Sequence, residues 1–297
     1  MHADRRRIVR QPRGVPSGTA CGRVFSMAAA ALCLVAGMLP DRVGGPLRLE
    51  GAPPAAVASR SELEQPPPPP VAAPRRTQSR LPPPPLREYK GRRIAQTMHY
   101  SGAEWLTRDN REQEERCSLM LANLGVRRGM TLCDMGCGNG FYTLQLARMT
   151  GEQGHVYAVD IQPEMLQLLN RRADEQQIRN ITPVLGTLTD PRLPRGRIDL
   201  ILLVDVYHEF SHPEEMLAAM RQALAPGGLC VLVEFRAEDP AVPIKPEHKM
   251  SKEQILKEWP PNGFKLVKQF DGLPWQHMMF FARDDDPAFP AAEGAPK

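Results

Sequence analysis

An open α/β sheet is the fold that this sequence predicts, because short apolar segments alternate with amphipathic ones through its C-terminal two thirds. Five apolar segments have the length of strands, and segments with helical spacing separate them. Residues 198–206 are so apolar that both faces of this strand must be covered, as happens in a parallel sheet. Two further strands lie close together near the C-terminus, which predicts an antiparallel hairpin at one edge of the sheet.

The strands and helices can be assigned in order along the chain. We expect seven strands, at residues 131–135, 155–160, 181–185, 198–206, 229–235, 264–270 and 278–283. We expect helices at residues 104–124, at 141–149, from Pro163, from Pro213 to the turn at 226–228, and at 251–259. Proline is favoured in the first turn of a helix, where its missing N–H costs nothing. His212, just before Pro213, is expected to cap its helix.

Composition divides the chain into four parts. Residues 1–43 are a basic segment with an apolar run at 24–39, and residues 44–93 are predicted to be a disordered linker, since 13 of the 31 prolines lie between Pro46 and Pro85. Residues 94–284 form the predicted domain, and residues 285–297 a disordered tail. The order of basic and apolar residues favours a signal or a membrane anchor, unless translation starts at Met27. The apolar run is slightly short of the roughly 17–25 residues of a membrane-spanning helix.

Charge and cysteine content exclude some classes of function. Residues 1–93 hold 16 Lys and Arg against 6 Asp and Glu, whereas the remainder holds 22 against 28. No nucleic-acid partner is therefore expected for the folded domain, although the basic arm could contact acidic lipid or nucleic acid, or be a solvated tail. The six cysteines have neither disulfide-framework nor zinc-type spacing, so we predict no metal site.

A glycine-rich loop connects the first strand to the helix that follows it. Its sequence is Asp134-Met135-Gly136-Cys137-Gly138-Asn139-Gly140. Glycines let the backbone approach a ligand closely, and a helix N-terminus supplies free N–H groups. A dinucleotide fingerprint beginning at Gly136 would need a glycine at position 141, where this chain has Phe141. The loop therefore indicates a ligand other than a nicotinamide dinucleotide.

The loop resembles that of the class I S-adenosylmethionine (SAM)-dependent methyltransferases, close to the quinone-type C-methyltransferases. Asp160 and Ile161 match the second-strand motif of that family, and residues 205–213 match its fourth-strand segment. The resemblance implies a Rossmann-like fold and SAM as cofactor. The implied SAM contacts are Asp134, Gly136, Cys137, Gly138, Gly140, Asp160, Ile161, Thr187, Leu188 and Asp205. After the third strand many relatives have an acid for the adenine; here Thr187 and Leu188, or Asp190, would take its place.

Candidate catalytic residues follow the fourth and fifth strands, because ligands of open α/β sheets bind beyond the carboxyl ends of strands. Tyr207, His208 and Glu209 fit this rule best. His208 could take a proton from an acceptor near neutral pH, or it could only shape the loop. Glu234 and Arg236 could orient a charged substrate or pair with each other.

Two further segments could border the site. His248 and Lys249 lie in the loop after the fifth strand and are weaker candidates. Residues 98–106 precede the sheet, where many relatives of the methyltransferase family carry a lid. Tyr100 or Trp105 could cap the methyl donor or stack on an aromatic acceptor, or Trp105 could only fasten the N-terminal helix to the sheet.

We therefore expect a SAM-dependent methyltransferase that acts on a small or medium-sized acceptor molecule. The alternative is a catalytically silent SAM-binding sensor or scaffold. Membrane association through residues 24–39 is possible, but SAM is a cytoplasmic metabolite, so localisation stays open, as does the oligomeric state.

Overall fold

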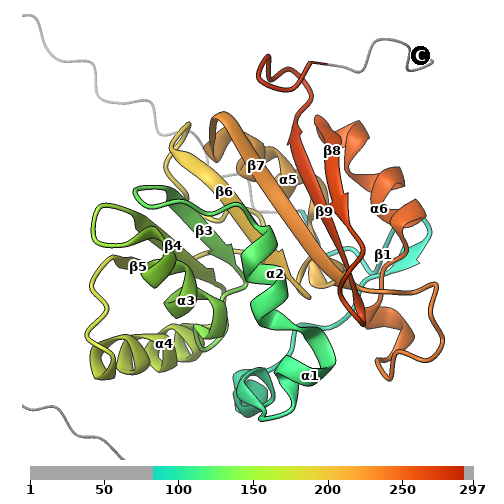
Figure 1. The fold of residues 1–297 in the computed structure, drawn as a ribbon. Helices are drawn as coiled ribbons and strands as arrows, with labels where there is room; N and C mark the ends of the chain where they lie inside the picture. The colour runs from blue at the N-terminus through green and yellow to red at the C-terminus, as the bar shows by residue number, and fades with distance from the viewer. Residues whose placement is uncertain (1–82, 291–297) are drawn as a thin grey trace, which may run out of the picture. The chain divides into compact units, whose positions relative to one another are not determined.

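The computed structural model describes residues 83–290, which contain a seven-stranded sheet in the order β5-β4-β3-β6-β7-β9-β8 (Figure 1). The first five of these strands are parallel, and β9 runs antiparallel to both of its neighbours. The strands are β3 (Thr131–Met135), β4 (His155–Asp160), β5 (Ile181–Leu185), β6 (Ile198–Val204), β7 (Leu224–Phe235), β8 (Phe264–Phe270) and β9 (Gln276–Arg283). The predicted open α/β sheet with a C-terminal antiparallel strand is thus confirmed.

Helices cover both faces of the sheet (Figure 1). On one face, α2 (Cys117–Asn123), α3 (Phe141–Thr150) and α4 (Pro163–Glu175) pack against side chains such as Leu132 and Ala158. On the other, α5 (Pro213–Ala223) and α6 (Lys252–Glu258) pack against side chains such as Cys133 and Leu203. Neighbouring residues of one strand therefore serve opposite faces, which explains why the central strands are almost wholly apolar.

The predicted helix at residues 104–124 is wrong as a single element. The structure has a 3-10 helix, η1 (Tyr100–Thr107), then α1 (Arg111–Glu115) and α2. Arg116 separates α1 from α2 with a φ of 52°, a left-handed conformation that cannot continue a right-handed helix. The amphipathic spacing predicted helical residues correctly but did not reveal this break.

Residues 83–93 pack on the domain, although the sequence assigned them to the linker. The strands β1 (Glu88–Tyr89) and β2 (Arg92–Arg93) form a small antiparallel hairpin. The Arg92 Nε atom lies 2.7 Å from Oε1 of the fully buried Glu258, and Arg92 Nη1 donates to the His208 carbonyl at 2.9 Å. The high proline content led us to assign these residues to the linker. The contacts of Arg92 gave no signal in the sequence, because its partners are distant along the chain. We refer to residues 86–95 as the strap.

The C-terminal end also differs from its prediction. Asp286, expected in the disordered tail, is buried and accepts a hydrogen bond from the Gly227 N–H at 2.7 Å. Likewise, His212 stands at the N-cap position just before α5, but its side chain makes no capping hydrogen bond. Its Nε2 atom instead lies 2.6 Å from the Pro83 carbonyl oxygen.

The apolar run at 24–39, its basic flank and most of the predicted linker lie outside the described residues. Between residues 83 and 290, no helix is both long and apolar enough to cross a membrane.

Candidate active site

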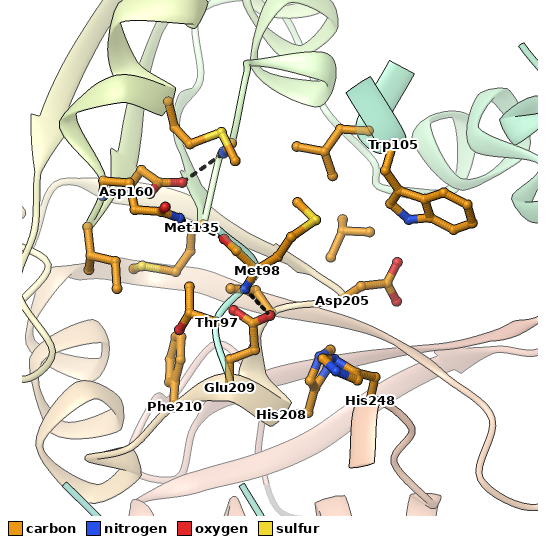
Figure 2. A pocket seen from close by; sticks show the side chains of 18 of the residues that line it. Thr97, Met98, Trp105, Met135, Asp160, Asp205, His208, Glu209, Phe210 and His248 are labelled. Atoms are coloured by element: carbon orange, nitrogen blue, oxygen red, sulfur yellow. Dashed lines mark hydrogen bonds between the residues drawn. The ribbon is translucent and has the colours of Figure 1, made fainter. Parts of the chain in front are cut away.

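A cavity of about 520 Å³ lies beyond the carboxyl ends of the parallel strands. Residues at and just after the ends of β3, β4, β6 and β7 border the cavity. Residues of the segment 97–106, which precedes the sheet in the chain, also border it. Its volume falls within the roughly 300–1,000 Å³ of typical ligand sites. Figure 2 shows Asp160 and the His208–His248 pair at opposite sides of this cavity. We call these sides the Asp160 end and the histidine end.

The glycine loop forms one wall of the Asp160 end. The Gly136 and Cys137 N–H groups donate to the Val159 carbonyl of β4, at 2.8 and 2.9 Å. Gly136 has a φ of 70°, and a Cβ atom there would lie 2.3 Å from Cγ2 of Val206. The backbone thus passes so close to the loop after β6 that only glycine fits at this position.

Asp160 connects the end of β4 to the glycine loop. Its Oδ2 atom accepts the Gly138 N–H at 2.9 Å, and Oδ1 accepts the Gln162 N–H at 2.9 Å (Figure 2). The side chain is nearly buried, and burial raises the pKa of the carboxyl despite these hydrogen bonds. Each carboxylate oxygen has a second lone pair, so Asp160 can still accept hydrogen bonds from a bound ligand.

Two other parts of the predicted cofactor set border the cavity. Ile161 is about one-third exposed there, and Thr187 and Leu188 border it from the turn after β5. The Thr187 hydroxyl oxygen accepts the Asp190 N–H at 2.9 Å, which holds the turn together. Asp190 itself does not border the cavity, so Thr187 and Leu188 are the residues that the structure places there.

Asp134, Cys137 and Gly140 do not border the cavity, although the sequence placed them among the cofactor contacts. The buried Asp134 carboxylate accepts the Thr143 hydroxyl hydrogen at 2.5 Å. Burial raises the pKa of Asp134 to about 6. A Cβ atom on Gly140 would lie 2.2 Å from Cδ1 of Leu169, so this glycine lets α3 and α4 pack. These residues therefore hold the glycine loop in place on its side away from the cavity.

The three predicted catalytic residues form the 3-10 turn η2 (Tyr207–Glu209) and point in three directions. Tyr207 lies in the core and not at the cavity: its hydroxyl donates to Glu258 Oε2 at 2.8 Å, and its ring packs against Trp259. Glu209 borders the cavity and accepts the Met98 N–H at 3.2 Å (Figure 2). Burial raises the Glu209 pKa to about 7, while the nearby His208 charge lowers it.

His208 has partners at both ring nitrogens. Nδ1 lies 2.7 Å from Oε2 of the buried Glu234, and Nε2 lies 3.0 Å from Nδ1 of His248. Burial alone would lower the His208 pKa, but the Glu234 carboxylate outweighs it and raises the pKa. Of the two alternatives for Glu234 and Arg236, the structure excludes a pair between them: Glu234 binds His208, and Arg236 binds the carbonyl oxygens of Asp271 and Leu273.

Asp205 and the ion pair of Arg111 with Glu115 also border the cavity. The sequence did not predict that these residues lie at one site. β6 ends at Val204, two residues before the predicted end, and Asp205 follows it with a φ of 50°. Its Oδ2 atom accepts from Gln276 at 2.7 Å, but Oδ1 is buried without a hydrogen-bond partner in the described part of the chain. Burial, together with the charges of Glu115 and Glu234, raises the Asp205 pKa. Glu115 pairs with Arg111 at 2.9 Å, and both border the cavity.

The segment 97–106 crosses the cavity beside these acids. Trp105 borders the cavity, is about half exposed and has the Arg108 guanidinium 3.8 Å from its ring centre. Tyr100 does not border it. Gln162, which sequence reasoning missed, fastens this segment by accepting the Tyr100 N–H at 2.8 Å and donating to the Met98 carbonyl at 2.9 Å. No spacing could have indicated Gln162, since these partners lie more than 60 residues away.

Comparison with protein families decides the class of this domain. Residues 127–280 match the family described as a methyltransferase domain. The chain belongs to this family. The match confirms the expected methyltransferase class for this domain, and family membership implies SAM as the cosubstrate.

Individual relatives are more distant. The chain is 29% identical over 153 residues to the ubiquinone/menaquinone biosynthesis C-methyltransferase UbiE of Azotobacter vinelandii, a match covering 49% of this chain and 60% of that protein. It is 27% identical over 115 residues to a protein-L-isoaspartate O-methyltransferase of Methanothrix thermoacetophila, covering 39% and 52%. The chain thus spans about half of the length of these curated relatives.

A solved structure agrees with the fold. A SAM-dependent methyltransferase from Aquifex aeolicus superimposes with a TM-score of 0.59 at 23% identity, covering 62% of this chain and 98% of that one. At this identity the likeness supports the Rossmann-like fold alone.

Proposed function

We propose that this protein transfers a methyl group from SAM to a small or medium-sized acceptor bound at the histidine end of the cavity. The observation that carries the proposal is one continuous cavity that joins the glycine loop and Asp160 to His208, Glu209 and His248. A methyltransferase needs such a cavity, because donor and acceptor must meet near attack distance in a site from which water is excluded.

The residues at the Asp160 end fit SAM. Asp160 would accept hydrogen bonds from the ribose hydroxyls, since its oxygens keep free lone pairs. Ile161, Thr187 and Leu188 would contact the adenine, and Gly136 and Gly138 bring the backbone of the loop to the wall of the cavity. When bound, SAM supplies an electrophilic methyl carbon: the acceptor lone pair forms a bond to it while the carbon–sulfur bond breaks and sulfur keeps the electron pair.

The residues at the histidine end would hold the acceptor and take its proton. Met98, Trp105 and Phe235 give the cavity an apolar lining that suits an aromatic or other apolar body. Glu209 borders the same space with a pKa of about 7, which suits a general base near neutral pH. We assign the proton to Glu209, because both ring nitrogens of His208 already have partners. Tyr207 has no catalytic role in this proposal.

Calorimetric titration of the full chain with SAM tests the cofactor half. Asp160→Asn should weaken SAM binding at least tenfold, because an amide nitrogen would replace one accepting oxygen. Asp199→Asn is the matched control, since Asp199 accepts the Thr131 N–H at the opposite end of the sheet and does not border the cavity. Unchanged SAM affinity in Asp160→Asn would refute the assignment of the cofactor end.

Release of S-adenosylhomocysteine with a panel of phenols, quinols and other hydroxyl or acidic C–H acceptors tests the transfer half. With an active acceptor, the rate should rise as the pH passes 7, because Glu209 acts as a base only when ionised. Glu209→Gln should lower the rate and abolish this rise. Tight SAM binding without turnover on any acceptor would instead favour a sensor or scaffold.

A further inference from the structure

Three side chains at the histidine end bring together nitrogen and oxygen atoms of the kinds that bind transition metals. One ring nitrogen of His208, one of His248 and a carboxylate oxygen of Glu209 all lie within 4.8 Å of one another. The Nε2 atom of His208 is 3.0 Å from the Nδ1 atom of His248. His248 belongs to η3 (Pro246–His248), 40 residues after His208, so no spacing in the sequence announced the cluster. Figure 2 shows the two histidines together beside Glu209.

The first of these ligands is held in place by its surroundings. Glu234 accepts hydrogen bonds from the Tyr207 and His208 N–H groups through Oε1, and its Oε2 lies 2.7 Å from the His208 ring. Arg92 and the Ala95 N–H hold the His208 carbonyl at 2.9 and 3.1 Å. A buried carboxylate on Nδ1 leaves Nε2 as the ligating atom, which is the carboxylate–histidine arrangement of metal sites.

The other two ligands can adjust. His248 is the half-buried last residue of the short helix η3, and Glu209 uses one of its two carboxylate oxygens for the Met98 N–H. Zinc–nitrogen bonds of about 2.0–2.1 Å in a tetrahedron place two ring nitrogens about 3.3 Å apart. The observed nitrogen separation of 3.0 Å is close to that value. All three residues border the cavity, so a fourth coordination position would open toward the acceptor.

A hydrogen-bonded pair of histidines that relays protons is the competing explanation. It accounts for the short distance between the rings, but it needs neither the Glu209 carboxylate nor an opening toward the cavity. The presence of both favours a cation, and the Glu209 and Glu234 carboxylates supply negative charge around it.

We propose that His208, His248 and Glu209 bind a divalent transition-metal ion, with Zn²⁺ the best match to two imidazoles and one carboxylate. This inference rests on the proposed function in one respect: the open position would select acceptors that present a hydroxyl or enol oxygen to the cation. With the cation bound, the pKa of such a group would fall and its proton would pass to water. The role of base and the pH dependence assigned to Glu209 above would then describe the protein without the cation.

Metal binding can be measured without any acceptor. The full chain, freed of metal by a chelator, is titrated with Co²⁺, whose visible absorption reports four-coordinate binding, and with Zn²⁺ in competition. One equivalent should bind to the wild type, with Mg²⁺ unable to compete because it prefers oxygen ligands. His248→Ala should weaken binding at least a hundredfold, and Glu234→Gln about tenfold through the orientation of His208.

His155→Ala is the matched control, because His155 is also partly buried but lies at the start of β4, away from the cavity. Its metal affinity should equal that of the wild type. Equal affinity in His248→Ala and wild type, or no saturable binding to the wild type, would overturn the proposal and leave the histidine pair as a relay. Thermal unfolding of each variant shows whether it is folded.

The two proposals fail in different ways. If methyl transfer proceeds at the same rate with and without the cation, the inference about the acceptor is refuted while the proposed function stands. If the cation binds as expected but SAM does not, the proposed function is refuted and the metal site stands.

Discussion

The Asp134→Asn variant should gain stability relative to the wild type as the pH rises. Asp134 is 3% exposed at the end of β3, and burial raises its pKa from 3.8 to about 6 although the Thr143 hydroxyl bond lowers it. Between these two pKa values the folded chain holds a proton that the unfolded chain has lost. The free energy of unfolding therefore falls as the pH rises through this window and levels off above pH 6.

The magnitude follows from the two pKa values. At about 1.4 kcal/mol for each tenfold change, the buried carboxylate costs about 3 kcal/mol above pH 6, of which about 2 kcal/mol appears between pH 4.5 and 8. The amide that replaces the carboxyl cannot titrate, so the unfolding free energy of Asp134→Asn minus that of the wild type should rise by about 2 kcal/mol over this range. Any offset from the amide itself is constant with pH.

Urea unfolding of the SAM-free chain at pH 4.5, 5.5, 6.5 and 8 measures this difference. Thr143→Val provides the matched variant, because it keeps the side-chain shape but removes the hydroxyl that stabilises the carboxylate. The stability of Thr143→Val should continue to fall with pH beyond pH 6, since the Asp134 pKa would be higher. A difference between Asp134→Asn and wild type that does not vary with pH would refute the reasoning.

Three further outcomes are expected. Tyr207→Phe should lower the free energy of unfolding in urea by about 1.5–3 kcal/mol, because the hydrogen bond to the Glu258 carboxylate is lost. The methyl-transfer rate should stay within a few-fold of the wild-type rate; a loss of more than tenfold would restore Tyr207 as a catalytic candidate. Gly136→Ala should weaken SAM binding and lower stability by at least about 1–2 kcal/mol, and adding Val206→Ala should recover part of both losses if the 2.3 Å approach is their cause. Arg92→Met should cost about 3–5 kcal/mol, because it leaves Glu258 as an unpaired buried charge, and calorimetry showing an unchanged melting temperature would contradict this.

The sequence predicted well those features that depend only on residues close together in the chain. The bounds of β3, β4, β5 and β8 follow from apolar runs, and the glycine loop and Asp160 from their position between strand and helix. Contacts between distant segments left no such signal. His248 reaches His208 across 40 residues and Arg92 reaches Glu258 across 166, and no period in the sequence connects either pair.

The turn η2 shows a second limit of sequence reasoning. A 3-10 turn directs consecutive side chains to different surroundings, so naming three neighbouring candidates could not say which of them face the cavity. Tyr207 points into the core, whereas His208, held by Glu234, and Glu209 both border the cavity. Only the packing of α6 and β7 around the turn decides this.

The strap has a mechanical consequence. Its Leu86 N–H donates to the Ser211 carbonyl at 3.0 Å, and Arg92 and the Ala95 N–H both bind the carbonyl of His208. Force on the chain upstream of residue 83 would therefore reach the loop that carries His208 and Glu209 before it reaches the sheet. A protein tethered to a surface by its N-terminus would have its acceptor end under load, whereas a C-terminal tether would leave that end at rest.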